Sequence, residues 1–216
     1  VPGDHPAVIA SGPTVADASC SAEALEILQR YDIKVGQHVL EWLKNSESKT
    51  LQANDVAFVG SQFRVIATAQ ASLEAAARVA REAGVEVLLL GDTIEGEARE
   101  LARVQAARAL ARRRDKPGMA PCLILSGGET TVTVTGRGRG GRNTEFLLSL
   151  AIALKGTPGI YAWAADTDGI DGTQDNAGAV LTPASWARAR ALGLDAESLL
   201  ADNDSYCFFA ALDELL

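Results

Sequence analysis

The chain of 216 residues carries a net charge of −8 and is 47% hydrophobic. This acidic balance argues against a general nucleic-acid binder, because a phosphate backbone needs a basic face. No apolar run reaches the roughly 18 residues that cross a bilayer, and no signal-peptide pattern is present. We therefore expect a cytoplasmic protein without nucleic acid or membrane as a partner. Its three widely spaced cysteines and two histidines indicate no disulfide framework, metal pair or catalytic triad, so reduced, mostly buried thiols are expected.

The first half of the chain alternates short apolar runs, typical of buried strands, with longer stretches of helical spacing. We predict strands at 8–10, 55–60 and 85–90 and helices at 21–31, 36–44, 64–83 and 95–114. In the last of these helices, Leu101, Val104, Ala107 and Leu110 form an apolar side. Strand and helix in alternation imply a parallel sheet with helices packed on its faces.

The pattern changes after residue 115. Lys116, Pro117 and Gly118 interrupt it, and we predict a domain boundary there, with domains at 1–117 and 118–216. Beyond the boundary we predict strands at 122–126, 130–135 and 160–165 and helices at 143–154, 184–192, 196–201 and 205–215.

Residues 136–145 (GRGRGGRNTE) place four glycines and three arginines between a predicted strand and a predicted helix. Glycines let a backbone approach a ligand closely. The helix that begins near Asn143 directs free N–H groups back into the loop, which favours an anion, and the arginines add forked donors for carboxylate or phosphate. The Gly-Lys-Ser/Thr ending of a P-loop is absent. A flexible hairpin tip with solvated arginines is the alternative.

Two further motifs follow predicted strands, where ligands of α/β proteins tend to bind. Residues 126–130 (SGGET) could combine backbone donors with one carboxylate, and a tight hairpin turn is the alternative. Residues 166–172 (DTDGIDG) gather three carboxylates, which favours a hard cation such as Mg²⁺. A solvated Asp/Gly turn is the alternative there.

Two further motifs give weaker evidence of a functional site. Residues 202–205 (DNDS) are also explained as a helix N-cap, and residues 11–14 (SGPT) as a strand-to-helix turn. Taken together, glycine-rich and acidic loops that follow strands favour a phosphate-handling cleft over a structural role.

Four segments occur in the order seen in class II glycerate 2-kinases: VPGDHPAVIASGPTVAD, LSGGETTVTVTGRGRGGRNTE, AADTDGIDGTQDNAGA and DNDSYCFF. The chain resembles this family over nearly its whole length, and its second half resembles the family's MOFRL domain. Two positions depart mildly from the family pattern: Thr144 stands where Gln is expected, and Thr173 where Pro is frequent.

The resemblance implies an α/β fold, with an incomplete Rossmann-like parallel sheet and flanking helices at 1–117 and a smaller α/β MOFRL domain at 118–216. It implies phosphorylation of D-glycerate to 2-phosphoglycerate by ATP with Mg²⁺, and it leaves a homodimer open. The family's catalytic lysine and a C-terminal segment have no counterpart in the chain. The resemblance therefore implies a chain truncated at both ends, inactive in isolation but able to bind ligand weakly.

The resemblance also assigns roles to the motif residues. Arg142 would bind the glycerate carboxylate or the moving phosphate, and the aspartates of the acidic loop would ligate Mg²⁺ or accept the hydroxyl proton. The catalytic candidates are Glu129, Arg142, Asp166 and Asp168, and the metal candidates are Asp168 and Asp171. The substrate and phosphate candidates are Ser11, Gly12, Thr14, Ser126, Gly127, Gly128, Gly138, Gly140, Gly141 and Asn143.

Two alternatives stay open. Some family members carry an older hydroxypyruvate reductase label, which would mean NAD(P)H chemistry, but the chain shows no G-x-G-x-x-G loop between an early strand and helix. A fragment that binds an anionic metabolite without turnover is the other alternative, favoured by the missing lysine region.

Overall fold

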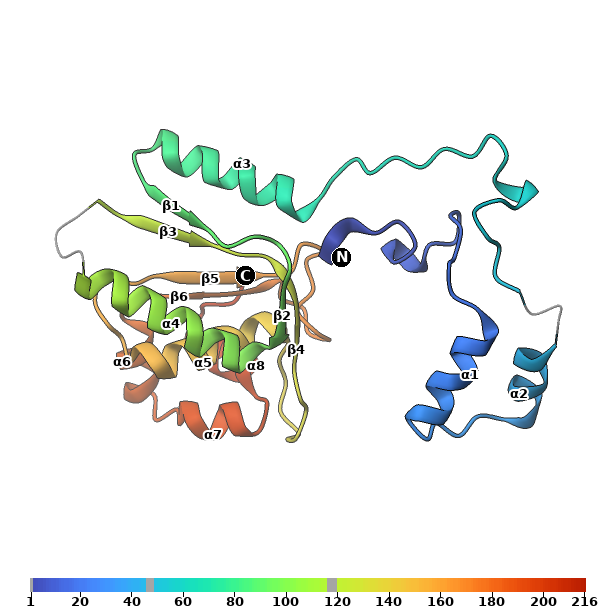
Figure 1. Cartoon of the computed structure of the whole chain (residues 1–216). Helices are drawn as coiled ribbons and strands as arrows, with labels where there is room; N and C mark the ends of the chain where they lie inside the picture. Colours follow the sequence, from blue (N-terminus) through green and yellow to red (C-terminus); the bar gives the residue numbers. More distant parts are fainter. Residues whose placement is uncertain (1, 46–48, 116–119) are drawn as a thin grey trace. The chain divides into compact units, whose positions relative to one another are not determined.

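The computed structural model describes residues 2–45, 49–115 and 120–216. The chain forms two compact units, Val1–Ser72 and Leu73–Leu216 (Figure 1). The domain boundary predicted at 116–118 lies outside the described residues and stays a prediction.

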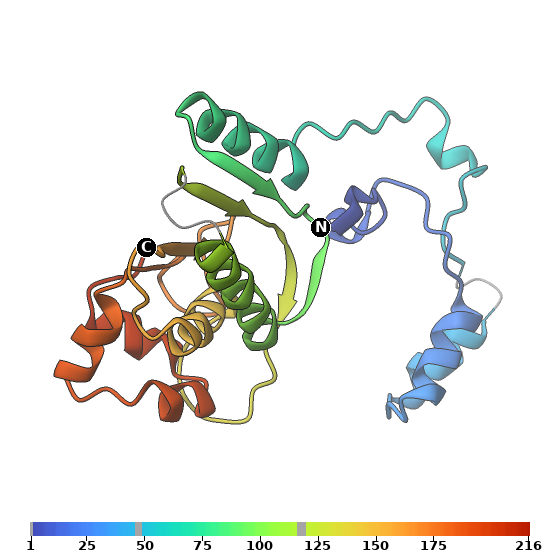
Figure 2. The same cartoon turned by 60° about the vertical axis from the view of Figure 1, so that its left-hand side comes forward.

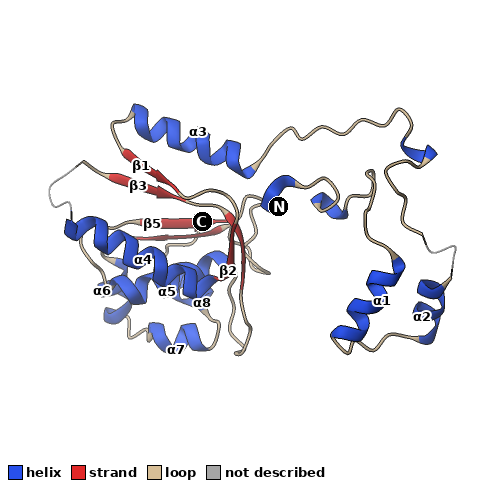
Figure 3. Cartoon of the chain, in the orientation of Figure 1, coloured by secondary structure: helices blue, strands red, loops and turns tan. Residues whose placement is uncertain are grey.

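The first unit consists of helices and loops in its described residues (Figure 3). α1 (Ser21–Arg30) and α2 (Gln37–Lys44) confirm the two helices predicted here, and they pack against each other. None of the side chains described in this unit is buried.

The strands predicted at 8–10 and 55–60 are wrong. The first region forms a 3-10 turn at Ile9–Ser11, in which Ala10 has a φ of 49°, outside the extended range of a strand. At the second, the Asp55 side chain accepts a hydrogen bond from the Ala57 N–H at 2.9 Å and caps another 3-10 turn. A short apolar run does not by itself separate a strand from such a turn.

The second unit holds all the strands that the structure describes, arranged in pairs (Figure 1). They are β1 (Glu86–Leu89), β2 (Ile94–Glu97), β3 (Cys122–Leu125), β4 (Gly128–Thr131), β5 (Ala162–Ala165) and β6 (Gly178–Leu181). β1 pairs in parallel with β3, and β2 pairs in parallel with β4. β5 pairs antiparallel with β6, a strand that was not predicted. Parallel pairs flanked by helices confirm the predicted α/β class.

The helices from residue 69 onward lie close to the predicted ranges, with two later starts and one earlier end, since α8 ends at Ala211 and not at 215. They are α3 (Ala69–Glu82), α4 (Ala98–Asp115), α5 (Arg142–Leu154), α6 (Ser185–Ala191), α7 (Ala196–Ala201) and α8 (Ser205–Ala211). α3 follows Thr68, whose hydroxyl accepts a hydrogen bond from the Ala71 N–H at 3.0 Å. α4 starts late because the residues before it pair with β4 as strand β2.

The apolar side predicted for α4 is not its buried face. Val104 and Leu110 are 49% and 37% exposed. The buried positions are Ala98, Ala102 and Ala106. Alanines spaced four residues apart share one face of a helix, and their small size lets α4 lie close beside α5 (Figure 2).

α5 is the central helix of the core. Leu147 and Leu148 are fully buried against Phe208, Phe209 and other core residues. The two phenylalanine rings meet edge to face, with centroids 5.1 Å apart. Because α5 also contacts α4, α7, α8, β5 and β6, its amino terminus is held at a fixed place in the unit.

The three cysteines are free. Cys122 and Cys207 are half-buried, but Cys20 is exposed, so the expectation of mostly buried thiols is wrong for Cys20. Among the helices in the described part of the chain, none is long and apolar enough to cross a membrane.

Candidate functional site

The glycine-arginine loop, residues 136–141, ends at the amino terminus of α5. Gly141 is extended and directly precedes Arg142, the first residue of the helix. The hydroxyl of Thr144 accepts a hydrogen bond from the Gly141 N–H at 3.0 Å, so a side chain of the first turn reaches back to the cap as in a capping box. This contact fixes the direction in which the chain enters α5.

Arg142 brings together three of the predicted motifs. Its guanidinium donates to Glu129 Oε1 on β4 and, at 3.0 Å, to Asp166 Oδ2 directly after β5. The Arg142 side chain is 33% exposed. Burial works against the charged form, but the hydrogen bonds to Glu129 and Asp166 outweigh it and raise the pKa of Arg142. A charged guanidinium in reach of solvent therefore lies between two carboxylates.

Asp171 closes the same helix end from the inside, where its carboxylate is fully buried. Oδ1 accepts from the Asn143 N–H at 2.8 Å and from Asn143 Nδ2 at 3.2 Å. Oδ2 accepts from the Thr144 N–H and from the Thr144 hydroxyl, both at 2.8 Å. These donors use the roughly four lone-pair positions of a carboxylate. The prediction of free N–H groups at this helix end is wrong for Asn143 and Thr144, and Asp171 does not fit the metal role predicted for it.

Asp168 is exposed, and its Oδ1 accepts from the Ile170 N–H at 3.0 Å. The hydrogen bonds of Asp166 use its Oδ2, so each of these two aspartates keeps a second oxygen. Mg²⁺ at phosphate sites is commonly held by one or two carboxylates plus phosphate oxygens, and this donor set fits that ion. Within the described ranges, no three or more His, Cys, Asp or Glu side chains are grouped around one metal position.

Ser126 and Gly127 of the SGGET motif link β3 to β4, and the rest of the motif lies in β4, so the hairpin alternative is wrong. β3 and β4 pair with β1 and β2, not with each other. The Gly127 N–H donates to Gly91 O at 2.9 Å, which leaves it unavailable to a ligand. The motif contributes Glu129, whose carboxylate accepts a hydrogen bond from Arg142. Ser126 and Gly128 are exposed, and their role in binding stays a prediction.

The glycine-arginine loop lies on the DNDS turn. The Arg137 N–H donates to Asp202 Oδ1 at 3.0 Å, and the Gly138 N–H donates to Asp202 O at 2.8 Å. The Arg139 N–H donates to Asp204 Oδ1 at 3.0 Å. These contacts overturn the flexible-hairpin alternative. They also leave the Gly138 amide unavailable as a phosphate donor, while the role of Gly140 stays a prediction.

Sequence reasoning missed what the DNDS turn does. Asp204 is the residue before α8, but its side chain makes no cap hydrogen bond and binds the loop instead. Tyr206 was also missed: its ring lies under the Arg139 guanidinium at 4.9 Å, and its hydroxyl donates to Asp175 at 2.9 Å. No local sequence pattern predicts such contacts, because the two residues of each pair lie far apart in the sequence.

Ser11, Gly12 and Thr14 belong to the first unit. Ser11 and Gly12 have φ values of 61° and 55°, in the left-handed region, and the chain turns sharply there. A Cβ at Gly12 would overlap the backbone of Ala7. The cleft-lining role of these residues stays a prediction.

Two family models match parts of the chain. Residues 122–216 match the MOFRL family, and residues 1–44 match a domain of unknown function, DUF4147. The MOFRL match takes in β3 to α8, and with them the loops that meet at Arg142.

Individual relatives match along most or all of the chain. An Agrobacterium vitis protein with a provisional hydroxypyruvate reductase name is 50% identical, over 100% of this chain and 49% of its own length. The D-glycerate 2-kinase of Thermotoga maritima is 35% identical, over 94% of this chain and 48% of its own length. The crystal structure of a glycerate kinase from Thermotoga maritima matches with a TM-score of 0.78 at 34% identity, covering 100% of this chain and 51% of its own. The chain spans about half the length of the curated relatives it matches, and its resemblance to glycerate 2-kinases is confirmed.

Proposed function

We propose that the parent protein of this chain is a D-glycerate 2-kinase, which transfers the γ-phosphoryl group of ATP to the 2-hydroxyl of D-glycerate in the presence of Mg²⁺. The observation that carries this proposal is the meeting of Glu129 of β4, Arg142 at the start of α5 and Asp166 directly after β5, at the exposed end of a buried helix. The names of the glycerate kinase relatives support it.

The wider setting follows from the same proposal. The parent would act in the cytoplasm on small molecules, as a monomer or homodimer, without nucleic acid or membrane as a partner. We keep the two-domain division near residue 117, because the MOFRL match begins at residue 122.

Arg142 is the proposed anion-binding group. Phosphoryl transfer depends mainly on positioning and on neutralising the charge of the phosphoryl oxygens. A forked guanidinium suits a glycerate carboxylate or those oxygens. Glu129 is the more exposed partner, with a side chain 53% accessible against 18% for Asp166. An incoming anion would therefore displace Glu129, while Asp166 would keep the guanidinium oriented.

The aspartates of the acidic loop divide the remaining tasks. Asp166, held within 3.0 Å of Arg142, is the carboxylate placed to accept the hydroxyl proton of a substrate that Arg142 binds. Mg²⁺, when bound, would neutralise charge on the phosphate oxygens, and Asp168 would hold it. Asn143 orients Asp166 through an Nδ2 contact of 3.3 Å.

A hydroxypyruvate reductase is the second candidate, favoured by the provisional names of two Agrobacterium vitis relatives that are 50% and 45% identical. A coupled assay on the full-length parent separates the two. We expect ADP release that depends on both D-glycerate and Mg²⁺, with 2-phosphoglycerate rather than 3-phosphoglycerate identified by NMR. Oxidation of NADH or NADPH by hydroxypyruvate, without ADP release, would establish the reductase instead.

A further inference from the structure

The DNDS turn has no role in the proposed chemistry, yet it organises the loop that leads to Arg142. Five consecutive amides, from Thr135 directly before the loop to Arg139 within it, each donate to an oxygen atom of this turn, over distances of 2.8 to 3.0 Å. The acceptors come from Asp202, Asn203 and Asp204. Backbone N–H groups are strong donors, and here one short turn supplies the acceptors for five of them in succession.

Asn203 is the centre of this arrangement and is only 6% exposed. Its Oδ1 accepts from the N–H groups of Thr135 at 2.8 Å and Gly136 at 2.9 Å. Its Nδ2 donates to Glu145 Oε2 at 2.9 Å and to Thr133 O at 3.3 Å. A carboxamide has two donors and one oxygen with two lone pairs, so the Asn203 side chain uses its full capacity. Another side chain of similar size would not reproduce this set.

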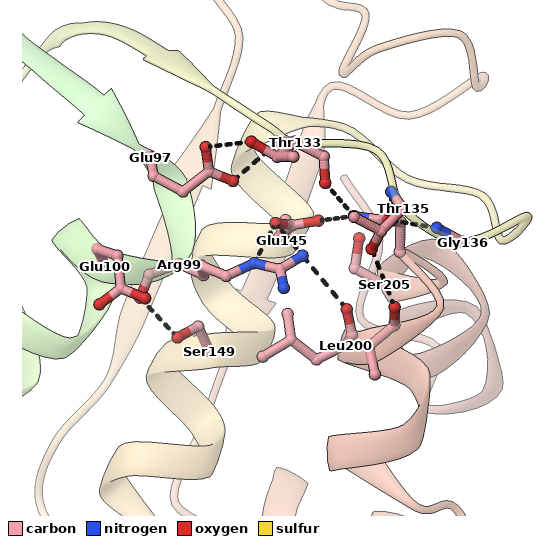
Figure 4. A network of polar contacts seen from close by, with 12 residues as sticks. Glu97, Arg99, Glu100, Thr133, Thr135, Gly136, Glu145, Ser149, Leu200 and Ser205 are labelled. Carbon is pink, nitrogen blue, oxygen red and sulfur yellow. Dashed lines mark hydrogen bonds and ion pairs between the residues drawn. The ribbon is translucent and has the colours of Figure 1, made fainter.

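Glu145 connects Asn203 to the helical core. It lies on α5, is 1% exposed, and receives a hydrogen bond from Arg99 Nε of α4 at 2.8 Å (Figure 4). Arg99 also donates to Leu200 O at 3.4 Å, just before the turn. A buried carboxylate persists only when it is paired and hydrogen-bonded. The turn is thereby tied to α4 and α5 at once.

The loop also fits the turn in shape. A Cβ at Gly136 would overlap the backbone of Asp202, and one at Gly140 would overlap Ser205 Oγ. The Ser205 hydroxyl in turn donates to Thr144 Oγ1 at 3.0 Å, inside the first turn of α5. The glycines therefore serve close contact with the turn, and the same contact reaches the helix end that carries Arg142.

We propose that Asn203 is a positioning residue for the transfer reaction, an inference that rests on the proposed kinase function. Asn203 holds the backbone of the glycine-arginine loop, and the loop sets the start of α5 and the place of Arg142. Because the amides from Thr135 to Arg139 are already bonded, these five do not bind phosphate, and the loop recognises it through its guanidinium groups.

The test uses the full-length parent with Asn203→Ala and, as a matched control, Ser149→Ala. The control removes a part-buried hydrogen bond of the same region, from Ser149 Oγ to Arg99 O at 2.8 Å, which joins α4 to α5 and does not involve the loop (Figure 4). Both variants should melt below the wild type. Only Asn203→Ala should lose turnover, by about 10²-fold in kcat, the cost of misplacing a reacting group by about 1 Å. The KM for D-glycerate should change much less.

A second variant, Asn203→Asp, covers the case in which Asn203→Ala does not fold. It keeps the acceptor for the two loop amides but sets a second carboxylate against Glu145, with Arg99 as the neighbouring cation. Two such carboxylates share a proton at low pH. The ratio of its kcat to that of the wild type should therefore rise as the pH falls.

The outcomes are distinct. Asn203→Ala with the turnover of the wild type, or a flat kcat ratio for Asn203→Asp, would show that the turn is only structural and would overturn the inference. A wild-type parent without glycerate-dependent ADP release would overturn the proposed function, and the inference with it, before any variant is compared.

Discussion

Replacing Asp171 with asparagine separates a structural role of this buried carboxylate from a reactive one. Asparagine keeps one oxygen for Asn143 but turns an NH₂ group toward Thr144, whose N–H then lacks its acceptor. A buried donor without a partner costs about 1–3 kcal/mol, and loss of the negative charge at the helix N-terminus costs a further ~0.3–2 kcal/mol. We expect Asp171→Asn to lower the free energy of unfolding by about 3 kcal/mol.

The measurement is thermal unfolding of the 216-residue chain followed by circular dichroism. A loss of that size should lower the melting temperature by roughly 6–12 °C. Asp168→Asn is the matched control, because it makes the same change in the same loop at an exposed position. It should stay within about 0.5 kcal/mol of the wild type. Equal melting temperatures for the two variants would refute the capping role of Asp171.

Two smaller predictions concern charge. Glu129→Gln removes one competitor for the Arg142 guanidinium, so calorimetry should show about two- to fivefold tighter binding of inorganic phosphate in the absence of Mg²⁺; unchanged affinity would contradict the displacement of Glu129. The Ser198 hydroxyl, at 2.7 Å, is the largest cause that lowers the pKa of Asp195, so Ser198→Ala should raise that pKa in an NMR titration. Because the pKa of Asp195 is depressed by folding, its contribution to stability is present above the unfolded pKa and is lost as the pH falls through the folded pKa. If Ser198→Ala left the pKa of Asp195 unchanged, the Ser198 hydroxyl would not be the cause of its depression.

Local patterns predicted the helices well and the short strands poorly. α1 and α5 lie near their predicted ranges because helical spacing over two or more turns is a local property. Ala10 shows the limit: its run of apolar neighbours suggested a strand, but a positive φ makes it part of a turn. Val104 shows a second limit of local patterns. The face of α4 that packs against α5 is the one with the small alanines, and the larger Val104 side chain is left exposed.

The sequence predicted the residues of the candidate site, but not all of the contacts between them. Glu129, Arg142 and Asp166 were all singled out from their motifs, and the structure brings them into contact. Asp171 was assigned to metal because a sequence does not show which carboxylate becomes buried under a helix end. The contact between Arg137 and Asp202 spans 65 residues, a distance over which no spacing rule operates.

The most direct test of the proposed site is the effect of Arg142→Ala on glycerate-dependent ADP release by the full-length parent. Arg190→Ala, an exposed arginine on α6, is the matched control. We expect Arg142→Ala to lower kcat/KM by at least about tenfold, equivalent to about 1.4 kcal/mol, while the melting temperature barely moves and the control keeps wild-type kinetics. A kcat/KM for Arg142→Ala equal to that of the control would show that Arg142 only forms a surface ion pair, and would contradict the account.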